Sequence, residues 1–448
     1  MNISNLFIFK KIDIKVISVW LVLFVLLQSF FSFQSTQSFL SRFGLLQLVS
    51  LFFFSTFFAL AKKIKPKQVF LLIFVYQLTL VLFLFTFYVL AYGNPLGFEP
   101  KDAVYYNLLG LELQNKNLYS SIVYLLENRR VGDLGFPILL KFIYSLGGNK
   151  ILNVKIFNIL FHLLTCFYLY KISIYINLKK YICKNILILY GLNPISIYFN
   201  ASGLKEPFLL LMVTLSFYFF YKAYTKKLIG YYFVSFLTLL MTGLFRAPFP
   251  VLIFFSLGSL LFIEIKGRYR YIFRIFILLI VPLLLVPILW VVKDELIAKI
   301  AINRSIAVTN RIGIQAGFFE YSIMAVSGII GPFPTFAYGI ENDNYLLQTV
   351  GNFIKLVLSY FFLIGCVQIF KNKLRKFYPL LIFIASNIAM LTFAAATLDH
   401  RLLYPFIPFY FLIIGYGYSL EQYYGFYLRR YMVYIVFIII LVIGYNLR

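Results

Sequence analysis

Charged residues are scarce in this chain of 448 residues, at 12% of the sequence. A soluble domain carries about a quarter, so the composition excludes a protein surrounded by water on all sides. The chain is instead 62% hydrophobic and 21% aromatic. Its apolar runs are long enough to cross a hydrocarbon core of roughly 30 Å as helices. They are continuously apolar, which favours helices over the alternating strands of a β-barrel.

Cysteine and histidine are also rare, with three cysteines and two histidines. Cys166, Cys183 and Cys366 have neither a metal-binding spacing nor the pattern of a disulfide set, so we expect them to pack in the protein interior. His162 lies in the middle of an apolar run and is expected to be a hydrogen-bonded core residue. The loops that we assign to the cytoplasm hold no glycine-rich phosphate cradle, which argues against an ATP-driven machine.

The apolar runs predict an all-α, polytopic integral membrane protein of about thirteen transmembrane helices. Lys10, Lys11 and Lys15 precede the first run, which exceeds a signal-peptide core of roughly 7–15 residues, so we expect an uncleaved anchor. The predicted spans are 16–33, 43–61, 69–92, 151–170, 185–199, 206–221, 228–245, 250–264, 275–292, 350–370, 378–397, 403–420 and 431–446.

The net charge of +26 is distributed according to the sides of a membrane. The N-terminus and every second connection carry 24 of the 41 lysines and arginines but only three acidic residues. An excess of basic residues in short loops is typical of the cytoplasmic side. We therefore expect an inner (plasma) membrane protein with a cytoplasmic N-terminus and an external C-terminus, in contact with membrane lipids. The basic excess is a topology signal, and we expect no nucleic-acid partner.

Two connections on the predicted outer side are too long for simple turns, at 93–150 and 293–349. The first contains a short amphipathic stretch near 108–116. A second apolar stretch, Phe136 to Leu146, is too short to cross and is expected to lie in the interface or to re-enter the membrane. The chain then divides into two N-terminal helices (1–68), a helical module with the first outer loop (69–292), the second outer loop (293–349) and the C-terminal helices (350–448).

Ionisable residues cluster at the outer ends of the predicted helices, where proximity to lipid makes them costly. A carboxylate can take a proton from a hydroxyl, and arginine suits a phosphate group. We predict Asp102 as the catalytic base, and Glu99, three residues earlier, as a second catalytic residue. Lys205 and Glu206 could also pair with each other at a helix start. The predicted substrate-binding residues are Arg129, Arg130, Asp133, Lys205, Glu206, Arg246, Arg304, Arg311, His400, Arg401 and Tyr404.

The order of three segments resembles the GT-C superfamily of membrane glycosyltransferases, which includes protein O-mannosyltransferases and lipid A aminoarabinose transferases. These segments are Asp102 with Tyr105 and Tyr106, then GDLGFPILLKFIYSLGG, then NPISIYFNASGLKEP. The resemblance covers mostly 95–250, and DHRLLYPFIP is similar to a late segment of that superfamily. It implies a catalytic module at 69–292, a polyprenyl-linked sugar donor, a glycan or lipid acceptor, and Asp102 as the catalytic acid.

The chain departs from the superfamily pattern in two respects. Two additional spans precede the first outer loop, and Asp102 has no adjacent second acid. Whether a divalent metal takes part is therefore left open. Two other functions also stay open: a repeat-unit polymerase for O-antigen or capsule, in which Arg304 and Arg311 would act, and a flippase for lipid-linked oligosaccharides.

Overall fold

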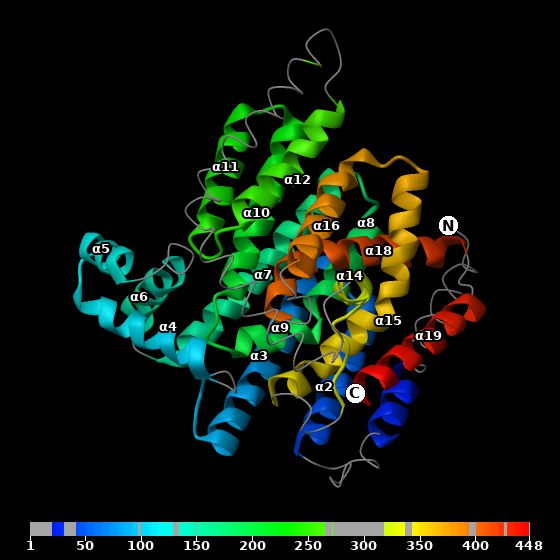
Figure 1. The fold of residues 1–448 in the computed structure, drawn as a ribbon, viewed down its shortest axis with the longest axis horizontal. Helices are drawn as coiled ribbons and strands as arrows, with labels where there is room; N and C mark the ends of the chain where they lie inside the picture. Colours follow the sequence, from blue (N-terminus) through cyan, green and yellow to red (C-terminus); the bar gives the residue numbers. More distant parts are fainter. Residues whose placement is uncertain are drawn as a thin grey trace.

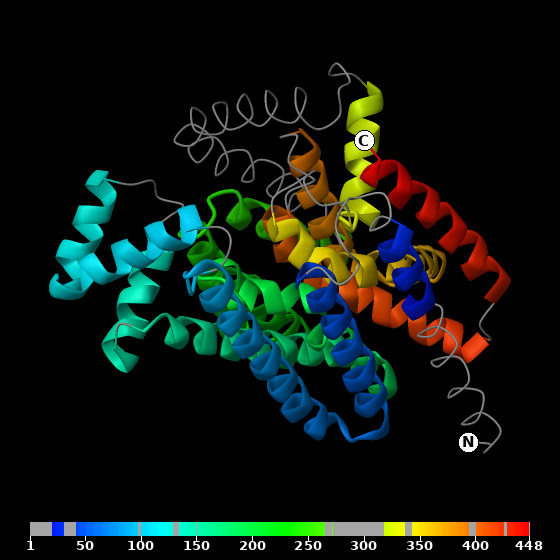
Figure 2. The same ribbon diagram turned by 90° about the horizontal axis from the view of Figure 1, so that it is seen from below.

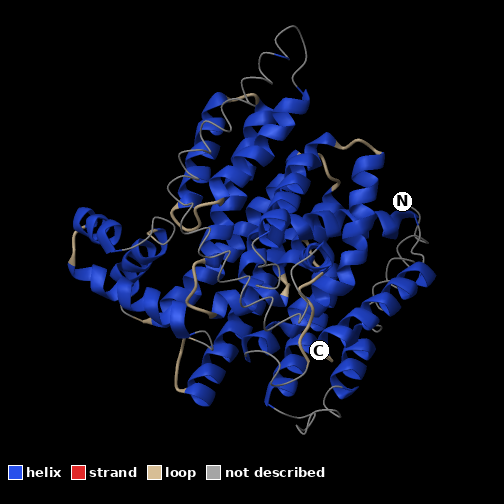
Figure 3. Cartoon of the chain, viewed as in Figure 1, coloured by secondary structure: helices blue, strands red, loops and turns tan. Residues whose placement is uncertain are grey.

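The computed structural model describes residues 20–30, 42–96, 100–128, 134–148, 150–264, 271, 318–336, 343–393, 400–424 and 428–447. Within these ranges the regular structure is helical and no strand occurs (Figure 3). Eight of the described helices are long and apolar enough to cross a membrane, or nine if one bent pair counts as a single span. The described part of the chain is thus all-helical and has the long apolar helices of a polytopic membrane protein.

The candidate spans are the longest helices, and α16 and α18 are extended at their starts by short 3-10 turns. They are α2 (Arg42–Lys63), α3 (Pro66–Tyr92), α7 (Ile151–Tyr175), α10 (Glu206–Lys226), α15 (Asp343–Lys371), α16 (Tyr378–Phe393), α18 (Ile407–Tyr424) and α19 (Leu428–Asn446). The shorter helices are α4 (Pro100–Glu112), α5 (Leu118–Asn128), α6 (Gly135–Gly147), α8 (Lys180–Gly191), α9 (Pro194–Ala201), α11 (Ile229–Gly243), α12 (Phe249–Glu264), α14 (Phe318–Ile330) and α17 (His400–Leu403). The 3-10 turns are η1 (Leu113–Asn115), η4 (Arg375–Phe377) and η5 (Tyr404–Phe406).

The prediction of thirteen full crossings is confirmed only in part. α11 and α12 occupy two of the predicted spans but have 15 and 16 residues, which makes them about 22 and 24 Å long. The first predicted span is described only as the short apolar helix Trp20–Phe30, and the span predicted at 275–292 lies outside the described residues.

The span predicted at 185–199 is broken into α8 and α9, which meet at 47°. Pro194 cannot continue the backbone hydrogen bonds of α8, so a new helix starts there. The side chain of Asn193 caps α9 by accepting a hydrogen bond from the amide of Ile195, at 3.1 Å. The break exposes backbone groups within the bundle, and these must find partners among the neighbouring helices.

Buried polar side chains from α3 and α7 supply those partners. Gln77 of α3 donates to the carbonyl of Gly191 at 3.2 Å and to the hydroxyl of Ser196 at 2.7 Å. Nε2 of His162, on α7, lies 3.2 Å from the same carbonyl oxygen. The expectation that His162 is a hydrogen-bonded core residue is confirmed, since it is almost completely buried.

α18 is the central helix of the bundle, and α15 packs along it. In the most apolar segment of the α18 span 94% of the residues are buried within the protein, whereas in that of α19 only 28% are buried. Glycines bring the α15 and α18 backbones together: a Cβ on Gly365 would lie 2.7 Å from the carbonyl oxygen of Ile413, and a Cβ on Gly417 would overlap that of Phe361. Small residues at such crossings allow the close packing that helices use within membranes.

Lysines gather at one end of the bundle, and a mixture of acidic and basic residues gathers at the other. Nζ of Lys62, at the end of α2, donates to Oδ1 of Asn185 in α8 at 3.2 Å and to the hydroxyl of Tyr418 in α18 at 3.3 Å. Lys184 donates to the carbonyl of Lys62 at 2.9 Å. The acidic and basic residues of the predicted site occupy the other end, as described below. α10, α11 and α12 lie side by side, and each runs along the bundle from one of these ends toward the other (Figure 1).

α4, α5 and α6 form a helical arm at one edge of the bundle (Figures 1 and 2). α4 and α6 cross closely, since a Cβ on Gly110 would lie 2.8 Å from Cβ of Leu140. The Tyr144 hydroxyl donates to Oδ1 of Asn107 at 2.5 Å, and burial raises the pKa of Tyr144 to about 12. The 13 residues of α6 give it a length of about 20 Å, which is too short for a membrane crossing.

Candidate functional site

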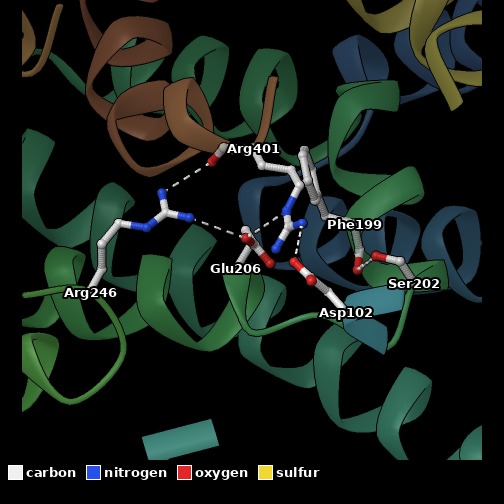
Figure 4. Close-up of polar contacts among 6 residues, drawn as sticks. All are labelled: Asp102, Phe199, Ser202, Glu206, Arg246 and Arg401. Carbon is white, nitrogen blue, oxygen red and sulfur yellow. Dashed lines mark hydrogen bonds and ion pairs between the residues drawn. The ribbon is translucent and has the colours of Figure 1, made fainter. Parts of the chain in front are cut away.

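Four segments far apart in the sequence meet at one end of the bundle (Figure 4). Asp102 comes from the first turn of α4, Glu206 begins α10, Arg246 lies in the turn between α11 and α12, and Arg401 belongs to α17. Three of these segments contain a proline at a helix end. Pro207 is at the start of α10, Pro248 precedes α12, and Pro405 follows α17. Each proline suits the first turn of a helix but interrupts a helix that reaches it, so all three segments are helix ends.

Arg401 holds two carboxylates with one guanidinium group. Its Nη1 lies 2.6 Å from Oδ2 of Asp102, and its Nε lies 3.2 Å from Oε1 of Glu206. The two carboxylates differ in burial, because the Asp102 side chain is 51% exposed whereas the Glu206 side chain is fully buried. Exposed ion pairs contribute about 0–1 kcal/mol, whereas removing one partner of a buried pair costs about 3–5 kcal/mol. Glu206 is therefore the fixed partner of Arg401, and Asp102 is the exchangeable one.

Arg246 approaches the same buried carboxylate from the other side. Its Nη2 lies 3.4 Å from Oε1 of Glu206, and its Nη1 donates to the carbonyl of Arg401 at 3.4 Å. Oε2 of Glu206 has no hydrogen-bond partner among the described residues. One buried carboxylate thus orients two guanidinium groups, which are 14% and 17% exposed.

The helical arm is attached to the turn that carries Arg246. The amide of Gly135, at the start of α6, donates to the carbonyl of Leu244 at 2.9 Å. A Cβ on Gly135 would lie 2.7 Å from the ring of Phe245, so only glycine allows this approach. Gly135, within the segment that the sequence singled out, therefore places the arm beside the arginine turn.

Lys205 lies between the arm and the bundle. Its Nζ is 5.5 Å from the ring centroid of Tyr106, whose ring packs edge-on against Phe136 at 5.2 Å. Glu206 makes ion pairs with the two arginines and also interacts electrostatically with Lys205, so the alternative that Lys205 pairs with Glu206 stays a prediction. Tyr106 was noted only as part of a motif, and its contact with a cation gives it a place in the site.

Lys155 and Asn158 were not identified from the sequence. Nζ of Lys155, on α7, donates to the carbonyl of Ala201 at the end of α9, and Nδ2 of Asn158 donates to the carbonyl of Ser202 at 3.2 Å. Both side chains are buried. They anchor the loop that leads directly to Lys205 and Glu206. The signal in the sequence that could have identified this anchor is Lys155, an ionisable residue within an apolar run.

The structure brings together four of the residues predicted for the site, Asp102, Glu206, Arg246 and Arg401, with Lys205 next to them. Tyr404 is buried behind them, with its ring 4.1 Å from that of Phe199, and its predicted contact with substrate is not visible in this packing. The backbone of His400 belongs to α17, but its side chain is outside the description. The predicted residues outside the described ranges are Glu99, Arg129, Arg130, Asp133, Arg304 and Arg311.

The described part of the chain contains no group of three His, Cys, Asp or Glu side chains that could hold a metal ion. What it does contain is three cations around one buried and one exposed carboxylate, at a helix-end surface of a membrane protein. Such an arrangement can bind an anion with fork-like donors and accept a proton on the exposed carboxylate. No protein-family model, curated protein or solved structure matches the chain. The class defined by fold and site is a polytopic helical membrane protein with an arginine–carboxylate cluster.

Proposed function

We propose that the protein is a membrane glycosyltransferase. It would move a sugar from a polyprenyl-phosphate-linked donor to an acceptor on the extracytoplasmic face, in the assembly of a cell-surface polysaccharide or glycolipid. The observation that carries this proposal is the contact of Asp102 with Arg401, one of two guanidinium groups that share the buried Glu206. This arrangement sets a proton acceptor next to cations that suit phosphate, at the edge of an apolar bundle.

The reaction assigns one role to each part of the cluster. The acceptor hydroxyl oxygen forms a bond to the anomeric carbon of the donor sugar, and its proton passes to Asp102. The bond between that carbon and the phosphate oxygen breaks, and the phosphate leaves with the electron pair. Arg246, Arg401 and Lys205 stabilise the charge that grows on the leaving phosphate. Glu206 does not contact the reacting atoms and serves to hold the arginines.

The charge pattern supports an external position for this chemistry. Lys62 and Lys184 lie at the end of the bundle opposite the cluster. If that end faces the cytoplasm, as basic loops generally do, the cluster faces outward. The donor would then be presented in the outer leaflet of the inner membrane, with its lipid chain along the apolar helices.

The test is the substitution Asp102→Asn, which preserves shape but removes the proton acceptor. We expect transfer of sugar from lipid-linked donor in isolated membranes to fall by about 10²–10⁴-fold, the usual contribution of a general base. Glu112→Gln is the matched control, because it removes the same charge from an exposed position of the same helix. Transfer at a near-normal rate in the Asp102→Asn protein would refute the mechanism.

The products of a deletion strain separate this function from a polymerase. A transferase mutant would change the composition or decoration of the surface glycan. A mutant of a repeat-unit polymerase would instead leave single capped units, and this outcome would replace the proposal with the polymerase function.

A flippase for lipid-linked oligosaccharides is favoured by one specific observation, the break between α8 and α9. Transporters often use broken helices near the middle of the membrane. This break lies between the Lys62 end of the bundle and the cluster end, and buried polar groups such as Gln77 surround it. Accumulation of the lipid-linked substrate on the cytoplasmic leaflet of a deletion strain would favour the flippase.

A further inference from the structure

The ion pair between Asp102 and Arg401 occupies the part of the guanidinium that an external anion would use. Nη1 of Arg401 contacts the exposed Asp102 at 2.6 Å, whereas Nε faces the buried Glu206 at 3.2 Å. The guanidinium fork fits a carboxylate and a phosphate equally well. An anion that arrives from outside therefore meets Asp102 as its competitor, because Glu206 has no exposed surface.

We infer that Asp102 is the internal counter-anion of a phosphate site, and that the phosphate of an incoming donor displaces it from Arg401. The inference rests on the proposed function for the identity of the phosphate carrier, and the chemistry it needs is a phosphate with at least two free oxygens. Displacement has a chemical consequence, because the lone pair of Oδ2 that accepts the hydrogen bond from Arg401 cannot at the same time accept the proton of a substrate hydroxyl. Binding of the donor would thus release the base that the transfer needs.

Two features of the site permit this exchange. Asp102 lies in the first turn of α4, where the helix dipole continues to stabilise its charge after it leaves Arg401. Its departure removes the 2.6 Å contact from Nη1 of Arg401, while Nε keeps its ion pair with the buried Glu206. A phosphate oxygen can then take the place of the carboxylate oxygen on Nη1.

The experiment measures binding and does not require transfer. The full chain is reconstituted in lipid nanodiscs, and its affinity for two probes, inorganic pyrophosphate and farnesyl phosphate, is measured by isothermal titration calorimetry. The variant Asp102→Asn keeps the side-chain shape and removes the competing charge. We expect it to bind the probes about twofold to fivefold more tightly than the wild type, the factor that corresponds to loss of an exposed ion pair.

Glu112→Gln controls for a general change of electrostatic potential. It removes one negative charge from the same helix, ten residues and about 15 Å further along, and we expect it to leave the affinity unchanged. Tighter binding of both probes by Asp102→Asn supports the inference for any phosphate. Tighter binding of farnesyl phosphate alone supports it for a lipid-linked phosphate.

Equal affinities of the wild type and Asp102→Asn, or the same gain in Glu112→Gln, would overturn the inference. The proposed function fails separately. If wild-type membranes transfer no sugar although Asp102→Asn binds the probes more tightly, the counter-anion exchange stands and the glycosyltransferase does not. If transfer depends on Asp102 but affinity does not, the enzyme stands and the exchange does not.

Discussion

The substitution Glu206→Gln tests whether one buried carboxylate organises the cluster. Oε1 of Glu206 accepts from Arg401 at 3.2 Å and from Arg246 at 3.4 Å, and the side chain has no exposed surface. Glutamine keeps an oxygen at this position but removes the charge. Hydrogen bonds to charged groups are about twice as strong as neutral ones, and a buried ion pair that loses one partner costs about 3–5 kcal/mol. Because both guanidiniums retain some exposure, we expect a loss near the lower end, about 3 kcal/mol.

The assay is the free energy of unfolding in mixed micelles, followed by titration with sodium dodecyl sulfate. A double-mutant cycle with Arg246→Gln identifies the cause of the loss. If the unpaired guanidinium is responsible, Arg246→Gln should be less destabilising in the Glu206→Gln protein than in the wild type, with a coupling of at least about 1 kcal/mol. Glu127→Gln, at an exposed position of α5, is the control and should stay within about 0.5 kcal/mol of the wild type. A Glu206→Gln protein as stable as this control, with additive effects in the cycle, would refute the reasoning.

Two further predictions concern packing around the site and at the centre of the bundle. Lys155→Met should lower the free energy of unfolding by about 1–3 kcal/mol, because the carbonyl of Ala201 loses its buried donor. Sugar transfer should fall as well. Unchanged transfer would mean that the loop before Lys205 and Glu206 needs no such anchor. Gly417→Ala should cost about 1–3 kcal/mol through overpacking against α15, measured by the same titration. Gly444→Ala is its control because nothing lies near a Cβ at that position, and equal stability of the two variants would contradict the close packing of α15 on α18.

The assembly of the cluster could be anticipated from the sequence because it depends on which side of the membrane each helix end faces. Apolar runs fix the number of crossings between two residues, and the alternation of basic and less basic loops fixes the side. These rules assign Asp102, Glu206, Arg246 and Arg401 to one side. The structure adds what they cannot give, the distances of 2.6 to 3.4 Å that join these residues.

The partners within the cluster could not be predicted, because they depend on how helices pack rather than on local sequence. Glu206 stands next to Lys205 in the chain, yet it contacts arginines 40 and 195 residues away. The broken span had a local signal in Asn193 and Pro194, since proline interrupts a helix. Its consequence, the network around Gly191, requires side chains from α3 and α7 whose positions only the fold defines.

The charged residues at the two ends of the bundle are related, because the helices that run between the ends fix the side on which each residue lies. A span that begins beside Lys62 or Lys184, including the broken span of α8 and α9, ends on the opposite side, and the residues that follow its end are placed there whatever their distance in sequence. Basic residues near one end are readily solvated, but the cations Arg246 and Arg401 at the other end lie largely within protein. A largely buried guanidinium is stable only with a buried counter-charge. Glu206 provides that charge at the first turn of α10, where the helix dipole also favours it. Arginines placed at this end of the bundle therefore require Glu206, whereas the exposed Asp102 is not explained by this requirement.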